Sequence, residues 1–113
     1  MTISYSAFFA PVQLGAAAGT LFTVPTSPTT TLMRGGRVRL ANCTAGAITA
    51  TLYAVPPAGT AGVTNAFLSA KSIAGNDYLD VDVPIMPAGA FMQGLASGAA
   101  SITIHMIGGS YFS

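Results

Sequence analysis

Apolar and polar residues alternate along most of the chain with a period of two, the pattern of β-strands that have one buried and one wetter face. In "GRVRLAN", residues 36–42, Val38 and Leu40 face one side while Arg37 and Arg39 face the other. Residues 47–55, 78–85 and 101–107 alternate in the same way, and their apolar faces consist of Ile48, Ala50, Leu52 and Ala54, of Leu79, Val81, Val83 and Ile85, and of Ile102, Ile104 and Met106. We expect each of these sets to line a core.

Less regular apolar segments at residues 2–9, 20–24, 66–73 and 90–95 and at the final aromatic residues complete the expected strands. Glycine- and proline-rich stretches separate the segments at intervals of roughly eight to twelve residues, which is typical of an antiparallel sandwich or barrel. Among these stretches are "RGG", with a turn expected at its two glycines, and "IGG". No long segment shows the 3.6-residue period of a helix. We therefore predict an all-β chain.

The length of 113 residues favours one domain, since domains typically contain about 100–150 residues. We expect this domain to cover residues 1–113, with residues 1–18 forming an N-terminal arm or the first strand.

Charge is scarce. The chain has four Lys and Arg and three Asp and Glu, where an ordinary chain of this length carries roughly 28 charged residues. A free monomer normally keeps a mixed charged surface, and large uncharged surfaces mark places where another protein binds. We therefore expect a subunit of an assembly, in which neighbouring subunits cover the uncharged residues 40–70.

Composition also argues against several classes of protein. The net charge of +1 gives no general attraction to nucleic acid. Thr, Asn, Pro and Gly interrupt the uncharged stretch, so it is not a membrane-spanning helix, and "MTISYSAFFAPVQLG" lacks the basic start and long apolar run of a signal peptide. The single cysteine, Cys43, allows no internal disulfide and fits a chain that folds in a reducing cytoplasm.

Three of the four basic residues, Arg34, Arg37 and Arg39, lie close together in the sequence. These three arginines are so large a share of the chain's charged residues that they dominate the electrostatic field around them. We expect them to form a docking patch for an acidic surface on a neighbouring subunit or partner. The alternative is that they solvate one sheet face and discourage aggregation at a strand edge.

The acidic residues form a second group, at Asp77, Asp80 and Asp82. Asp80 and Asp82 share a strand face. They could protect a strand edge, or pair with the arginines within the chain or across subunits, where they would help to set the register of the assembly. A calcium site would need further acidic ligands and a different spacing, so we expect no metal.

Few residues could support catalysis. His105 is the only histidine, so a zinc site would need it to converge with Cys43 and aspartates, and no signature of a nucleophilic site surrounds Cys43. The chain has no Glu, which leaves little for general acid–base chemistry. We expect neither enzyme activity nor a cofactor. "NCT" at residues 42–44 matches an N-glycosylation acceptor, but no secretion signal accompanies it.

Aromatic residues occupy both ends of the chain, at Tyr5, Phe8 and Phe9 and again at Tyr111 and Phe112. Chain ends are poorly ordered unless contacts hold them. We expect one or both ends to pack against the body or against a neighbouring copy, which makes Tyr5, Phe8 and Phe9 candidate interface residues. Deleting residues 1–9 should then weaken assembly more than it weakens the domain fold.

The order "GTLFTVPTSPTTTLMRGGRVRLANCTAGAITATLYAVPPAG", followed by "MPAGAFMQGLASGAASITIHMIGG", resembles small virion structural proteins of tailed bacteriophages. The resemblance covers roughly residues 19–109. It consists of a strand ending in Val-Pro, a strand ending in Asn with a turn, and a late Ala-Gly turn before the final strand. Many of these proteins have an acidic residue after that late turn, where this chain has Ala90.

This resemblance implies a β-sandwich or jelly-roll domain, usually oligomeric, on a phage particle that is assembled in the bacterial cytoplasm. The function we expect first is that of a capsid decoration, or cement, protein. It would form oligomers, with a trimer as the expected form, and bridge units of the major capsid protein. One alternative is a protein of the tail, collar or fibre. Another, of a different class, is a cellular ligand-binding β-sandwich, which the absence of Trp disfavours.

Overall fold

The computed structural model of the chain describes residues 11–26, 32–98 and 101–112, and these contain strands and loops but no helix. The strands are β1 (Val12–Gln13), β2 (Gly19–Thr23), β3 (Leu32–Asn42), β4 (Ile48–Val55), β5 (Ala66–Ile73), β6 (Tyr78–Asp82), β7 (Met86–Pro87), β8 (Phe91–Ala96) and β9 (Ile102–Phe112). The predicted all-β class is confirmed, and so are the strands expected near 36–42, 47–55, 66–73, 78–85, 90–95 and 101–107. Residues 2–9 lie outside the described part of the chain.

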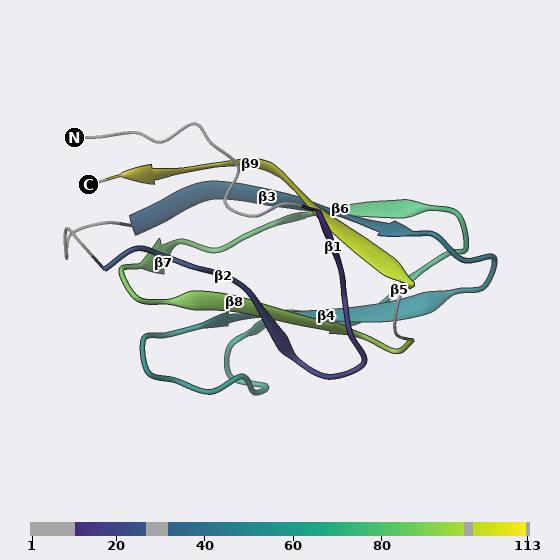
Figure 1. The fold of residues 1–113 in the computed structure, drawn as a ribbon, viewed down its shortest axis with the longest axis horizontal. Coiled ribbons are helices and arrows are strands. Elements are labelled where there is room, and N and C mark those ends of the chain that lie inside the picture. The colour runs from purple at the N-terminus through teal and green to yellow at the C-terminus, as the bar shows by residue number, and fades with distance from the viewer. Residues whose placement is uncertain (1–10, 27–31, 99–100, 113) are drawn as a thin grey trace.

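The strands form two antiparallel sheets that pack face to face. Sheet A has the order β1-β9-β3-β6, with β7 also paired to β3, and sheet B has the order β2-β8-β4-β5. Figure 1 shows them as an upper layer containing β9, β3 and β6 and a lower layer containing β8, β4 and β5. The predicted sandwich is therefore confirmed.

The pairing follows a simple rule. The hairpin β4–β5 lies at the middle of the chain, and strands at increasing distance on either side of it pair in turn: β3 with β6, β2 with β8 and β1 with β9. A long antiparallel ribbon that is doubled back and rolled into two sheets gives this order, which is that of a jelly roll. The short β7 is an addition beside β3.

The core lies between the sheets and consists of the inward residues of the alternating stretches. Val38 and Leu40 of β3 are fully buried, and Leu52 of β4 and Ile104 of β9 meet them from the facing and the neighbouring strands. Ala90 is buried too. An acidic residue at that position would place a carboxylate in this core, which is costly without a partner.

The expected alternation fails at Ile85, which is 66% exposed. Strand β6 ends before it, at Asp82, and Pro84 has no backbone N–H with which to continue the ladder. The chain shifts by one residue here, so Met86 enters the core in place of Ile85.

The prediction that "RGG" and "IGG" interrupt the strands, with a turn at Gly35 and Gly36, is also wrong. Both glycines lie inside β3, and Gly108 lies inside β9 opposite Arg37. The register between the two strands shifts from Arg34 to Arg37, as at a β-bulge. Gly35 has a φ of +69°, a left-handed conformation that glycine adopts without strain. The strand therefore bends at this point and continues.

Candidate interaction surfaces

The outer face of sheet A carries matched charges. Because Val38 and Leu40 point into the core, Arg37 and Arg39 on the same strand point outward. The register then places three rows across this face: Tyr78 with Ala41 and Thr103, Asp80 with Arg39 and His105, and Asp82 with Arg37 and Gly108. We call this surface the charged face and define it by Arg37, Arg39, Asp80 and Asp82.

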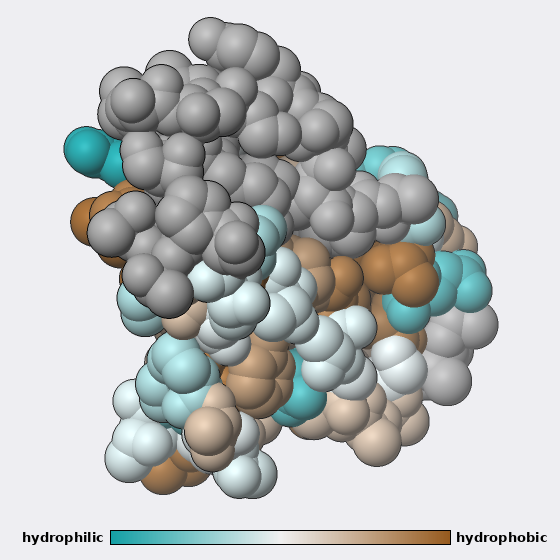
Figure 2. Space-filling model, turned by 60° about the vertical axis from the view of Figure 1, so that its left-hand side comes forward, coloured by the Kyte–Doolittle hydropathy of each residue, from teal (hydrophilic) through white to brown (hydrophobic). Residues whose placement is uncertain are grey.

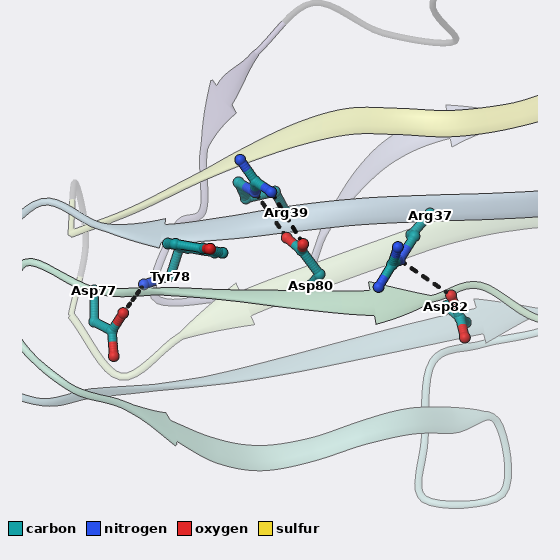
Figure 3. A network of polar contacts seen from close by, with 6 residues as sticks. All are labelled: Arg37, Arg39, Asp77, Tyr78, Asp80 and Asp82. Carbon is teal, nitrogen blue, oxygen red and sulfur yellow. Dashed lines mark hydrogen bonds and ion pairs between the residues drawn. The ribbon is translucent and has the colours of Figure 1, made fainter.

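Arg39 makes the closest ionic contact on the charged face. Its guanidinium donates two hydrogen bonds to the Asp80 carboxylate, Nε to Oδ1 at 2.8 Å and Nη2 to Oδ2 at 3.0 Å (Figure 3). Two parallel bonds match the planar guanidinium to the carboxylate. The Cζ atom of Arg39 also lies 4.4 Å from the ring centroid of Tyr78, which is within cation–π range. Two residues of β6 therefore hold Arg39 in place.

Arg37 and Asp82 form a looser pair. Their Nε and Oδ1 atoms are 3.4 Å apart, and the two side chains are 55% and 89% exposed. Exposed pairs of this kind contribute about 0–1 kcal/mol to stability, since water and salt screen them.

The Asp77 carboxylate accepts a hydrogen bond from the backbone N–H of Tyr78 (Figure 3). The Asp77 side chain therefore contacts the first residue of β6 and belongs to neither of the two ion pairs.

The hydrogen bonds from Arg39 lower the pKa of Asp80 below its ordinary value of 3.8, and those same bonds raise the pKa of Arg39. A carboxyl with a lowered folded-state pKa stabilises the fold at pH values above its unfolded pKa of about 4, and this contribution is lost as the pH falls through the folded-state pKa.

We accordingly predict that Asp80→Asn lowers the thermal midpoint at pH 7, and that the deficit relative to the unsubstituted chain narrows as the pH falls below about 4. Asp82→Asn is the matched control and should have a smaller effect, because its contact with Arg37 is longer and more exposed. Thermal melts of the three proteins from pH 7 to pH 2 would measure the difference. An Asp80→Asn deficit that stays constant over this range would contradict the assignment.

The structure thus brings Arg37, Arg39, Asp80 and Asp82 together within one chain, which is one of the arrangements that the sequence left open. Arg34 is separated from them by the bulge, and its register partner on β9 is Ser110. Tyr5, Phe8 and Phe9 lie outside the described residues. The docking role of all these residues remains a prediction.

The other residues considered for chemistry are dispersed. His105 lies beside Arg39 in the register, while the Cys43 sulfur lies 3.7 Å from the Thr103 hydroxyl and 3.7 Å from the Ala41 carbonyl oxygen. In the described part of the chain, no three His, Cys, Asp or Glu side chains gather as metal ligands would.

Asn42, the asparagine of the glycosylation-type sequence, has a structural role in this fold. It is 3% exposed, and its amide nitrogen donates to the carbonyl oxygens of Gly46, Ile73 and Ala74 at 2.9, 3.0 and 3.2 Å. Its side-chain oxygen accepts from the backbone N–H and the hydroxyl of Thr44 at 3.0 and 2.7 Å. The amide therefore joins the β3–β4 loop to the end of β5 and the loop after it, and it is not accessible for modification in the folded chain.

The outer face of sheet B is of a different kind. The inward residues of β8 and β4, such as Met92 and Leu52, are buried, so the residues between them point outward. The register assembles an uncharged surface on the four strands, which we call the uncharged face and define by Thr20, Thr23, Thr49, Thr51, Tyr53, Ser72, Phe91, Gln93 and Leu95.

Hydrogen bonds between strands organise the uncharged face. Gln93 Nε2 donates to Thr20 Oγ1 at 3.0 Å, and Thr51 Oγ1 accepts from the backbone N–H of Ala70 at 3.0 Å. Lys71 pairs in register with Ala50, an inward position. It is therefore not part of the uncharged face.

Only part of the uncharged face was foreseeable. The uncharged residues 40–70 include β4 and the first half of β5, and the expectation of a neutral surface there agrees with the register. The contribution of β8 was missed, because nothing local in "AFMQGL" indicates that it pairs with β4.

Large apolar side chains elsewhere on the surface are scattered. The most exposed is Val63, at 94%, in the loop between β4 and β5. On the side of the molecule drawn in Figure 2, hydrophobic residues lie in separate patches among hydrophilic ones. No helix that could cross a membrane occurs in the part of the chain that the structure describes.

No protein-family model, curated protein or solved structure matches this chain. The function therefore has to be argued from the fold and from its two outer faces.

Proposed function

We propose that this chain is a structural protein of a tailed-bacteriophage particle, and specifically a decoration protein that binds the capsid shell and stabilises it by bridging capsomers. The observation that carries the proposal is the separation of charge between the two faces of one small sandwich. The little charge that the chain has is concentrated in matched pairs on sheet A, and sheet B presents a face without charge. The resemblance over residues 19–109 supports the same assignment, and so does the jelly-roll strand order.

Matched charges suit docking on a shell. Arg39 and Asp80 hold each other in a fixed geometry, while the weaker and more exposed Arg37–Asp82 pair can exchange partners with charged groups of the major capsid protein at little cost. Complementary charges fix the register of an interface more than they raise its affinity. Many such weak contacts become strong when oligomers bridge several sites.

We predict that replacing Arg37 and Arg39 together with alanine weakens binding to shells by about tenfold or more at low salt, and that the difference shrinks as salt is raised. Co-sedimentation of the purified chain with undecorated shells would measure the binding. Lys71→Ala is the control, since it removes a positive charge outside the charged face. Binding that is equal for the chain and its double variant at every salt concentration would remove the support for docking through this face.

The copy number in purified particles tests the function itself. Shell decoration requires on the order of hundreds of copies, whereas a tail or collar ring holds about three to a dozen. Densitometry of purified virions would distinguish these values. Absence of the chain from the particle would overturn the proposal.

A tail, collar or fibre position is the second candidate, and the loop between β4 and β5 favours it. Asn65 organises this loop, since its amide nitrogen donates to the Thr60 carbonyl at 2.9 Å and its side-chain oxygen accepts from the Gly62 N–H at 3.1 Å. The loop presents Val63 almost fully exposed. An ordered loop with an apolar tip suits contact with a host surface or another virion protein.

A further inference from the structure

We infer that residues 4–10 form a strand that continues β1 along the side of β9 facing away from β3, in the same chain, and that this strand adds Tyr5 and Phe9 to the outer face of sheet A. The inference deepens the proposed function, because it gives the docking side of the sandwich an aromatic part. It rests on that function only for the role of this side. The strand itself is a property of the isolated chain.

Strand β9 is much longer than the strand that pairs with its outer side. It runs from Ile102 to Phe112 and pairs with β3 over this length, whereas its other side pairs with β1 only at Thr103 and Ile104. In Figure 1, β9 continues toward the C-terminus beyond its contact with β1. Among the described residues, therefore, no strand covers the outer side of β9 from His105 onward. We call this side the open edge.

The other sheet edges carry features that discourage strand addition. β6 has two aspartates, and β5 has an exposed lysine and a residue with a φ of +45°. β2 is short, and its register with β8 shifts between Thr20 and Phe22. β7 has only two residues, one of them a proline. The open edge, residues 105–112, contains no Lys, Arg, Asp, Glu or Pro. Long edges without such protection invite pairing with another strand.

The direction of β1 leads the preceding residues along the open edge. β1 is antiparallel to β9, with Val12 opposite Ile104, so the chain before β1 runs toward the C-terminal end of β9. Residues 105–112 form the open edge, and residues 1–10 are available to cover it. The segment reaches its own β9 without a connecting loop. Its effective concentration there exceeds that of a second copy, which commits the open edge to the same chain.

Pro11 is compatible with this arrangement. The Leu14 N–H donates to the Ile102 carbonyl oxygen at 2.8 Å, which makes these two residues a hydrogen-bonded pair. Such pairs alternate along an antiparallel ladder with pairs whose backbone groups point away from each other. Pro11, three residues before Leu14, therefore takes a position at which a residue donates no hydrogen bond to β9. Proline at such a position of an edge strand removes no ladder bond.

Alternation decides which side chains of the new strand face outward. Leu14 is buried in the core, so the even-numbered residues share its inward direction, and the odd-numbered residues, among them Phe9 and Tyr5, point outward. The register of β1 places Phe9 opposite Ile107, which is 43% exposed. The outer face of sheet A then has an aromatic part on one side of β9 and the charged face on the other. Buried aromatic residues supply much of the binding energy of interfaces, which complementary charges by themselves do not.

Disulfide trapping in the full chain tests the strand. Every variant carries Cys43→Ser, which removes the only native thiol. Phe9→Cys with Ile107→Cys should form an intrachain disulfide in a buffer with oxidised glutathione, because opposite residues of paired strands lie about 4.5–5.5 Å apart, within disulfide range. Phe9→Cys with Thr103→Cys is the matched control. Thr103 also faces outward on β9, but it lies four residues farther along, or about 13 Å, so its disulfide should form at least tenfold more slowly.

Mixing singly substituted chains shows whose β9 the strand occupies. A chain with Phe9→Cys should form mixed disulfides with an Ile107→Cys chain no faster than with a Thr103→Cys chain. Preferential linkage to the Ile107→Cys chain would overturn the inference in favour of strand exchange between copies. Equal rates of intrachain linkage for the two doubly substituted chains would overturn the strand altogether.

Two neighbouring phenylalanines separate the strand from its docking role. Phe8 faces inward in this arrangement, so Phe8→Ala should lower the thermal midpoint by about 5 °C and leave the binding of the folded chain to shells unchanged. Phe9→Ala should leave the midpoint within about 2 °C and weaken binding to shells about tenfold. The reverse pattern would overturn the assignment of faces. A trapped strand in a chain that binds no shell would overturn the proposed function alone.

Discussion

Asn42→Ala is expected to lower the free energy of unfolding by about 3 kcal/mol, although it removes only one small polar side chain. The Asn42 amide donates to three carbonyl oxygens, on Gly46, Ile73 and Ala74, at a site that is almost completely buried. Each buried polar group that loses its partner costs about 1–3 kcal/mol. The β3–β4 and β5–β6 loops would also lose the links that the Asn42 side chain makes between them.

Urea unfolding at one fixed protein concentration would measure this loss, since self-association makes apparent stability depend on concentration. Asn42→Asp separates hydrogen bonding from packing, because aspartate has the same size and keeps the oxygen acceptor. It has no amide donor, and its negative charge would face the carbonyl oxygens of Gly46, Ile73 and Ala74. It should be at least as destabilising as alanine at pH 7. Asn65→Ala is the control, whose more exposed hydrogen bonds should contribute no more than about 1 kcal/mol. Equal effects at both asparagines would contradict this account.

Gly75→Ala is expected to cost about 3 kcal/mol, which corresponds to a fall of roughly 10–20 °C in the thermal midpoint. A methyl group at Gly75 would overlap the backbone carbonyl of Ala45. That carbonyl cannot move away freely, because backbone hydrogen bonds next to it join its loop to the loop that contains Gly75. Asn76 N–H donates to the Thr44 carbonyl at 2.8 Å, and Asn42 N–H donates to the Asp77 carbonyl at 2.8 Å.

Gly46→Ala is the matched control for this prediction. It lies in the same pair of loops, but a methyl group there would meet no atom within 4 Å, so its effect should stay within about 0.5 kcal/mol. Thermal melts of both variants would give the comparison. A Gly75→Ala chain as stable as Gly46→Ala would show that the two loops are not in contact as described.

The regular strands were predictable because the direction of a side chain within a strand depends only on its position in the alternation. Val38, Leu40, Ile102 and Ile104 were assigned to the core on that basis, and all are buried. The rule failed where the backbone departs from regular geometry. Pro84 ends the ladder before Ile85, and Gly35 supplies the positive φ that lets β3 bulge and continue.

The candidate surfaces were predictable only in part. Arg37 and Arg39 were correctly placed on an outward face, and pairing with Asp80 and Asp82 within the chain was one of the open alternatives. From the sequence, Asn42 was considered only as part of a glycosylation-type sequence or as the last residue of a strand. Its role depends on Ile73 and Ala74, about thirty residues away along the chain, and no local pattern records such a contact.

The sequence alone determined which residues of the regular strands face inward, that the fold is all-β, and that the chain carries very little charge, because alternation and composition are local properties. Only the tertiary structure decided that β3 lies between β6 and β9 and that β8 lies beside β4. That choice created the charged face and the uncharged face. The reason is physical: strand pairing minimises the free energy of the whole sandwich, so the identity of a residue's neighbour across a sheet depends on residues far away in the chain.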